Sequence, residues 1–158
     1  MTATSQAPNE TKITDRIEQR LVLRAPRARV WRAIANAEEF GTWFGMKFDG
    51  AFTEGKPVRG IITFKAADHT LEMLVERIDP ERYFSYRWHP YAVDPRADYS
   101  AEPTTLVEFN LEEVDGGTAV TIVESGFDHI PLARRAEAFR MNNNGWAGQI
   151  KKLAQYVA

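Results

Sequence analysis

The stretch LARRAEAFRMNNNGWAGQIKKLAQYV, residues 132–157, decides the fold of this chain. One set of its residues recurs at alternating steps of four and three: Leu132, Ala136, Phe139, Asn143, Trp146, Ile150, Leu153 and Val157. This spacing predicts a helix with one largely apolar face, about 39 Å long. The run Asn142-Asn-Asn-Gly145 forms helix poorly, but the stripe continues through it, so we expect one unbroken helix.

The segments before this helix alternate with a period of two. Apolar and polar side chains alternate from Ile17 to Leu23 and in several runs between Val58 and Glu124, which predicts half-buried strands. Turns such as Asp115-Gly-Gly117 join successive strands as hairpins, and hairpins make an antiparallel sheet. We expect these large side chains on its inner face: Phe64, Met73, Phe84, Tyr86, Trp88 and Phe109.

Two short helices are expected between the first strand and the rest of the sheet. Pro26 suits the first turn of a helix over residues 27–35. Asn36, followed by Glu39 three residues later, predicts the start of a second helix that ends near Gly45. The predicted fold is therefore α+β: a curved antiparallel sheet of six or seven strands wrapped around the long C-terminal helix.

Composition limits what such a domain can do. The chain has 158 residues, a net charge of -2 and no cysteine. It therefore has no disulfide or thiolate metal site, and no strong field to attract nucleic acid or an anionic membrane. We expect a flexible tail over residues 1–12 and one domain over 13–158. Without an export signal or an apolar run long enough to span a membrane, we expect a cytoplasmic protein.

A helix lying across a curved sheet can leave a cavity between them. Apolar walls with a few polar groups are typical of small-molecule sites. The residues we expect to bind a ligand there are Trp43, Phe44, Met46, Phe64, Met73, Tyr86, Trp88, Phe109, Phe139, Asn143 and Trp146. For several of them a packing role is the alternative: the first three form either a gate or a helix packed on the sheet edge, and Asn143 bonds either a ligand or ordinary protein groups.

The sequence contains no recognisable catalytic or metal-binding motif. Its three histidines, His69, His89 and His129, lack metal-ligand spacing. His89 lies at a strand end beside the long loop, and we expect an exposed side chain there, with a side chain that reaches the cavity mouth as the alternative. No phosphate-binding loop or serine nucleophile motif occurs. We predict no catalytic residue, no metal and no cofactor, and we expect the charged pairs Arg27/Arg29, Glu38/Glu39 and Arg134/Arg135 to be solvated.

Several short segments, taken in their order along the chain, resemble segments of a known protein family. They are Ala25-Pro-Arg-Ala-Arg-Val-Trp-Arg-Ala-Ile34, Phe40-Gly-Thr-Trp-Phe44, Glu81-Arg-Tyr-Phe-Ser-Tyr-Arg-Trp88 and the closing Gly145-Trp146. The chain from Ile13 onward resembles the START-like, or SRPBCC, superfamily with its helix-grip fold. Within this superfamily, the chain is most similar to the family named for the C-terminal domain of the activator of the heat-shock protein 90 ATPase.

Three functions are compatible with this reading. The first is non-catalytic binding of a small hydrophobic or amphipathic molecule in the cavity. The second, implied by the resemblance, is a co-chaperone-like interaction module in the stress response, with a chaperone partner and an exposed apolar patch near Trp43 and Phe44. The third is a cavity enzyme, cyclase-like or hydrolase-like, which needs a buried acid or base; the sequence offers only His89 and Tyr86. A homodimer is also compatible with the sequence.

Overall fold

The computed structural model describes residues 15–63, 69–94 and 96–158. The predicted tail and Phe64 lie outside these residues. The elements, in chain order, are β1 (Arg16–Leu23), α2 (Arg27–Ala35), α3 (Ala37–Phe44), β2 (Met46–Phe48), β3 (Pro57–Ile62), β4 (His69–Asp79), β5 (Tyr83–Trp88), β6 (Thr105–Val114), β7 (Gly117–Ser125), the 3-10 turn η1 (Phe127–His129) and α4 (Leu132–Val157).

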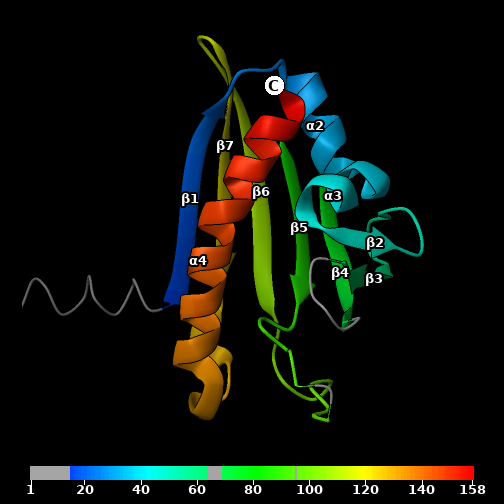
Figure 1. The fold of residues 1–158 in the computed structure, drawn as a ribbon, viewed down its shortest axis with the longest axis vertical. Coiled ribbons are helices and arrows are strands. Elements are labelled where there is room, and N and C mark those ends of the chain that lie inside the picture. Colours follow the sequence, from blue (N-terminus) through cyan, green and yellow to red (C-terminus); the bar gives the residue numbers. More distant parts are fainter. Residues whose placement is uncertain (1–14, 64–68, 95) are drawn as a thin grey trace, which may run out of the picture.

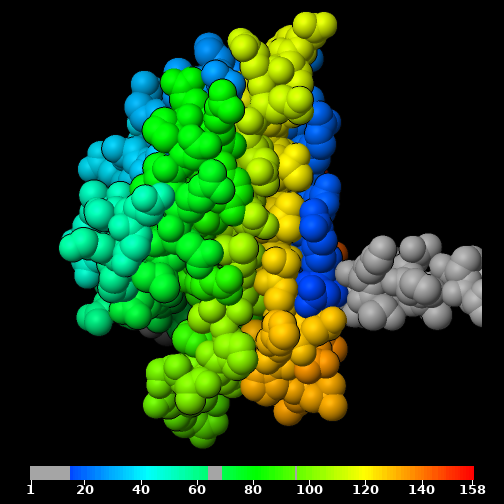
Figure 2. Space-filling model, turned by 180° about the vertical axis from the view of Figure 1, so that it is seen from behind, coloured from blue at the N-terminus to red at the C-terminus, as the bar shows by residue number. Residues whose placement is uncertain are grey.

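All strands belong to one antiparallel sheet in the order β1-β7-β6-β5-β4-β3-β2. Strands β2 to β7 follow one another as neighbours, and β1 closes the far edge against β7. Helix α4 lies across the inner face, while α2 and α3 cover one end of it (Figure 1). No helix of the described residues covers the opposite face of the sheet (Figure 2). This arrangement confirms the predicted helix-grip fold.

The two short helices begin and end where local chemistry predicts. Helix α2 follows Pro26, and the Asn36 side-chain oxygen accepts the Glu39 backbone N–H at 2.9 Å to cap α3. Gly45 ends α3 with a φ of 97°, a left-handed conformation that glycine adopts without steric cost.

The Glu39 side chain ties three helices together. Its carboxylate accepts hydrogen bonds from Arg29 and Arg32 of α2, both at 2.8 Å, and from the Tyr156 hydroxyl of α4 at 3.1 Å. Partial burial raises the pKa of Glu39, but these bonds outweigh burial and leave the pKa below its ordinary value. The expected solvation of Arg29 and Glu39 is therefore wrong, because α4 folds back over both.

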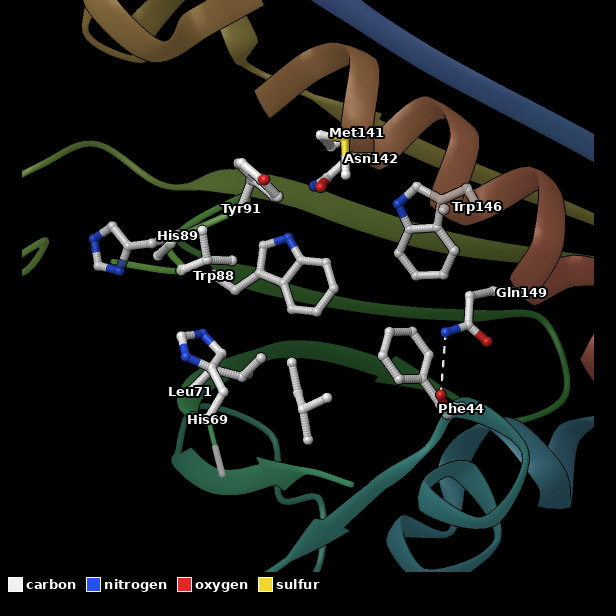
Figure 3. Close-up of a pocket in the computed structure, with 14 residues that line it drawn as sticks. Phe44, His69, Leu71, Trp88, His89, Tyr91, Met141, Asn142, Trp146 and Gln149 are labelled. Carbon is white, nitrogen blue, oxygen red and sulfur yellow. Dashed lines mark hydrogen bonds between the residues drawn. The ribbon is translucent and has the colours of Figure 1, made fainter. Parts of the chain in front are cut away.

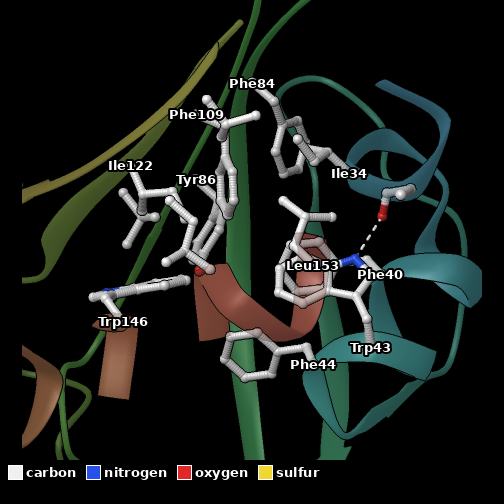
Figure 4. Packing of buried hydrophobic residues seen from close by; sticks show 14 of the residues in the cluster. Ile34, Phe40, Trp43, Phe44, Phe84, Tyr86, Phe109, Ile122, Trp146 and Leu153 are labelled. Carbon is white, nitrogen blue, oxygen red and sulfur yellow. Dashed lines mark hydrogen bonds between the residues drawn. The ribbon is translucent and has the colours of Figure 1, made fainter. Parts of the chain in front are cut away.

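The upper part of the space between the sheet and the helices is solid. The Phe40 ring is fully buried and packs against the rings of Trp43, Phe52 and Phe109, among others (Figure 4). Trp43 is buried too, and its indole N–H donates to the Ala33 carbonyl at 2.9 Å. The exposed patch expected near Trp43 and Phe44 is therefore wrong, since both side chains face this core.

Helix α4 is continuous, as predicted, but its inward face differs near its start. Leu132 is 79% exposed, and Ala136 and Asn143 are exposed as well, whereas Ala138 is buried and Asn142 faces inward. A strict 3-4 repeat drifts around a helix of 3.6 residues per turn. The inward polar residue is therefore Asn142, one position before the predicted Asn143.

The core assignment predicts a large loss of stability when Phe40 is truncated. Phe40→Ala is expected to lower the free energy of unfolding by roughly 3–5 kcal/mol, because a cavity replaces the ring. Leu132→Ala, at an exposed site of α4, serves as the control and is expected to change it by less than about 0.5 kcal/mol. Urea denaturation followed by circular dichroism measures both, and equal effects would contradict the assignment.

Candidate functional site

A cavity of about 250 Å³ lies between the middle of α4 and the sheet, below the solid core (Figure 3). The sheet side of the cavity carries Ile62, His69, Leu71 and Trp88, and the helix side carries Met141, Asn142, Gly145, Trp146 and Gln149. Phe44 at the end of α3, and His89, Tyr91, Ala92 and Val93 of the connection after β5, complete the lining. The walls are mainly apolar and aromatic, the composition of a small-molecule site.

Behind the aromatic wall lies a fully buried carboxylate, Glu124 of β7. The indole N–H groups of Trp88 and Trp146 each donate to it at 2.8 Å, from β5 and α4 respectively. The Asn142 amide donates to both carboxylate oxygens, at 3.0 and 3.2 Å, and the Thr105 hydroxyl of β6 donates as well. Four side chains from three elements therefore converge on one acidic group.

The donors around Glu124 match an ionised carboxylate. Indole and amide N–H groups can only donate hydrogen bonds. An ionised glutamate accepts at both oxygens, whereas a protonated one carries an O–H that must donate. Burial raises the pKa of Glu124 above its ordinary value, and the bonds from Thr105, Trp88, Trp146 and Asn142 each act against burial. Among the described residues no cation forms an ion pair with it.

Glu124 was not among the predicted site residues, although the alternation of β7 contains the signal. Thr118, Val120 and Ile122 all point to the inner face, and all are buried. Glu124 is the next residue in this period-two series, so it must point inward as well. A charged residue that continues a buried series is a candidate for a specific role, because a buried charge is costly without partners.

Arg134, at the start of α4, holds the described part of the connection between β5 and β6. Its guanidinium donates to the Pro90 carbonyl at 2.7 Å and to the Glu102 carboxylate at 2.7 and 2.9 Å, and it lies 4.8 Å from the centre of the Tyr99 ring. Figure 2 shows this connection beside the start of α4. The expected solvation of Arg134 is therefore wrong.

Tyr91, in the same connection, lines the cavity in an uncommon backbone conformation. Its φ is 50°, in the left-handed region that non-glycine residues rarely adopt. The Arg134 guanidinium reaches the Tyr91 carbonyl at 3.4 Å, and the Pro90 carbonyl next to it more closely. Arg134 therefore fixes the segment that forms one wall of the cavity.

The structure brings some of the predicted site residues together and separates others. Phe44, Trp88 and Trp146 line the cavity, with ring centroids 5.8–6.2 Å apart. Those that lie outside its lining are Trp43, Met46, Met73, Tyr86, Phe109, Phe139 and Asn143. Most of these are in the solid core, where side chains of both layers interdigitate, whereas Asn143 faces solvent. The ligand-binding role of each stays a prediction.

Two histidines belong to the lining of the cavity. His69 and His89 are half-buried and line the cavity, and His89 Nε2 lies 3.0 Å from the Glu102 carbonyl. The expected exposure of His89 is therefore wrong, and its position matches the alternative of a side chain that reaches the cavity; His129 is exposed. Within residues 15–63, 69–94 and 96–158, no cluster of acidic or histidine side chains has the composition of a metal site.

The raised pKa of Glu124 gives its contribution to stability a definite pH dependence. The folded state holds the proton more tightly than the unfolded state does, so stability falls as the pH rises from the ordinary glutamate pKa through the raised one. The difference in unfolding free energy between the wild type and Glu124→Gln is therefore expected to decrease as the pH rises from 4 to 8. Urea denaturation across this range measures it, with exposed Glu112→Gln as the control; a difference that rises with pH would contradict the assignment.

The contacts of Arg134 predict that its loss frees the connection between β5 and β6. In Arg134→Met, backbone amides near Tyr91 and Glu102 are expected to exchange with solvent at least tenfold faster, because charged hydrogen bonds contribute about 1.5–3 kcal/mol. Arg140→Met removes an exposed arginine of the same helix and should leave these amides unchanged. Hydrogen exchange by mass spectrometry tests this, and equal exchange in both variants would refute it.

Comparison with solved structures finds the same fold in proteins of low sequence identity. MLL2253 from Mesorhizobium loti matches with a TM-score of 0.71 and 22% identity, over 89% of this chain and 95% of that one. The Aha1 protein from Colwellia psychrerythraea, solved as a dimer in solution, matches with a TM-score of 0.66 and 18% identity, over 90% and 95%. DynU16, from the dynemicin biosynthetic locus, matches with a TM-score of 0.68 and 22% identity, over 90% of this chain and 46% of that one.

No curated protein matches the sequence. A family model does match, however, and it covers residues 24–158, from the end of β1 to the C-terminus. This span includes α2, α3, the remaining six strands and α4, and with them every residue of the cavity and of the Glu124 cluster. The chain therefore belongs to the family described as activator of Hsp90 ATPase homolog 1-like protein.

Proposed function

We propose that this protein binds a small apolar or amphipathic molecule in the cavity between its sheet and α4, without chemical conversion. The observation that carries the proposal is the cavity itself. Its volume of about 250 Å³ is near the lower end of the usual range for ligand pockets, and its walls combine aromatic rings with a few polar groups.

The surroundings of Glu124 favour binding over catalysis. A catalytic acid or base must come within hydrogen-bond reach of the reacting group. Glu124 does not line the cavity, because Trp88, Trp146 and Asn142 lie between them and use its oxygens as acceptors. Tyr86, one of the two candidates from the sequence, is fully buried and lies outside the lining. The other, His89, lines the cavity, but among the described residues its ring forms a hydrogen bond with the Glu102 carbonyl and with no carboxylate.

A co-chaperone-like interaction module remains the second candidate. It is favoured by the family description and by the Aha1 dimer from Colwellia psychrerythraea. The large exposed apolar side chains of the described residues are Val22, Ile61, Leu74, Leu132 and Met141, which lie on β1, β3, β4 and two places along α4. Because they are scattered, the surface supports a docking role less well than the cavity supports ligand binding.

Several broader expectations stay predictions. A chaperone partner, a homodimer, a cytoplasmic location and a role in the stress response each need direct measurement. The described residues include no helix that is both long and apolar enough to cross a membrane. Affinity capture from the native cell extract tests the chaperone partner, and absence of enrichment over a control would exclude that interaction.

Two glycines of α4 provide a matched test of cavity binding. A Cβ added at Gly145 or Gly148 meets no other atom within 4 Å, but only Gly145 lines the cavity. Gly145→Leu is expected to weaken binding of the neutral fluorescent probe phenylnaphthylamine at least tenfold by occupying the site, whereas Gly148→Leu should bind as the wild type does. Both substitutions remove a helix glycine and are expected to stabilise α4 by up to about 1 kcal/mol.

Fluorescence titration of the three proteins measures the affinities, and urea denaturation confirms that each is folded. Wild-type affinity in Gly145→Leu, or equal weakening in both variants, would contradict binding in this cavity.

A further inference from the structure

We propose that the cavity selects apolar molecules that carry a protonated amine and discriminates against carboxylates. This inference rests on the proposed function and names the class of ligand. It follows from three observations about the wall that α4 and β5 present to the cavity: a buried carboxylate behind it, an amide oxygen on it, and the aromatic rings that form it.

The first observation is the buried carboxylate of Glu124 and the set of groups that bind it. Its four partners are neutral donors, and within the described parts of the chain no arginine or lysine pairs with it. The carboxylate is shielded from water by the same side chains that line the cavity. In such surroundings a charge acts over a longer range than in water, so it attracts a cation in the cavity and repels an anion.

The second observation is the orientation of Asn142. Its amide nitrogen donates to both oxygens of Glu124, which assigns the nitrogen to the carboxylate side. Asn142 lines the cavity beside Tyr91 and Trp88 (Figure 3). Among the described residues no donor bonds to its oxygen, so the side chain offers a ligand an acceptor. Hydrogen bonding of the amide N–H to a carboxylate polarises that oxygen further.

The third observation is the aromatic lining. The rings of Phe44, Trp88, Tyr91 and Trp146 border the same space. The face of an aromatic ring is electron-rich and attracts cations, tryptophan most strongly. Gln149, which also lines the cavity, uses its amide N–H on the Phe44 carbonyl at 3.1 Å. Among the residues that the structure describes, no lysine or arginine lines the cavity, and His69 and His89 are the basic groups of the lining.

A matched set of ligands tests the selectivity. Naphthylmethylamine, naphthylmethanol and naphthoic acid share one aromatic body and differ in charge. Isothermal titration calorimetry at about pH 8, above the range in which histidine ordinarily titrates, is expected to give an affinity for the amine about tenfold higher than for the alcohol. The acid is expected to bind at least tenfold more weakly than the alcohol.

Three variants locate the cause of the preference. Glu124→Gln removes the charge and is expected to bring the affinity ratio of amine to alcohol close to one, with little change for the alcohol. Asn142→Leu removes the acceptor at a partly exposed position and is expected to reduce the ratio about threefold or more, which keeps the test available if Glu124→Gln does not fold. Glu112→Gln removes an exposed carboxylate of β6 and should preserve the ratio.

The outcomes separate this inference from the proposed function. If the three ligands bind and Gly145→Leu weakens all of them, but the acid binds as well as the amine, or Glu124→Gln and Asn142→Leu both leave the ratio unchanged, the selectivity is refuted and cavity binding stands. If none of the ligands binds, or Gly145→Leu affects none of them, cavity binding itself is refuted, and the selectivity with it.

Discussion

The buried carboxylate of Glu124 is the contact on which the lower half of the structure depends. It joins β7 to β5 through Trp88, to β6 through Thr105, and to α4 through Asn142 and Trp146. Burying an ionised group is costly, and the cost is offset only when good hydrogen bonds satisfy it. Two tryptophans and an asparagine are therefore held in set orientations, and these same side chains form the wall of the cavity.

The space between sheet and helix is divided into a solid and a hollow part. Around Phe40 and Phe109, side chains from α3 and the sheet are fully buried and pack ring against ring, and this close packing stabilises the fold. Nearer the start of α4, Gly145 adds no side chain and the Trp146 indole donates a hydrogen bond to Glu124. Arg134 fixes the connection over this end. The cavity therefore lies where hydrogen bonds to Glu124 and from Arg134, rather than close packing, position the side chains.

The strands and helices could be predicted well because their signals are local. Alternation within β1, β6 and β7, the cap at Asn36 and the glycine at position 45 each depend on residues a few positions apart. The site could be predicted only in part. Trp88 and Trp146 were expected to line a cavity and do lie there, whereas Tyr86 and Phe109 were expected beside them and instead fill the core. Alternation places a residue on a face of the sheet, but does not say how far along that face the hollow extends.

By itself, the sequence determined the order of elements, the antiparallel sheet and the long closing helix, since periodicity and turn chemistry act over short distances along the chain. Only the tertiary structure decided that Asn142 rather than Asn143 faces inward, that Arg134 binds the connection after β5, and that Glu124 is surrounded by four donors. The physical reason is that these partners are 18 to 44 residues apart, and folding alone brings their atoms within hydrogen-bond distance.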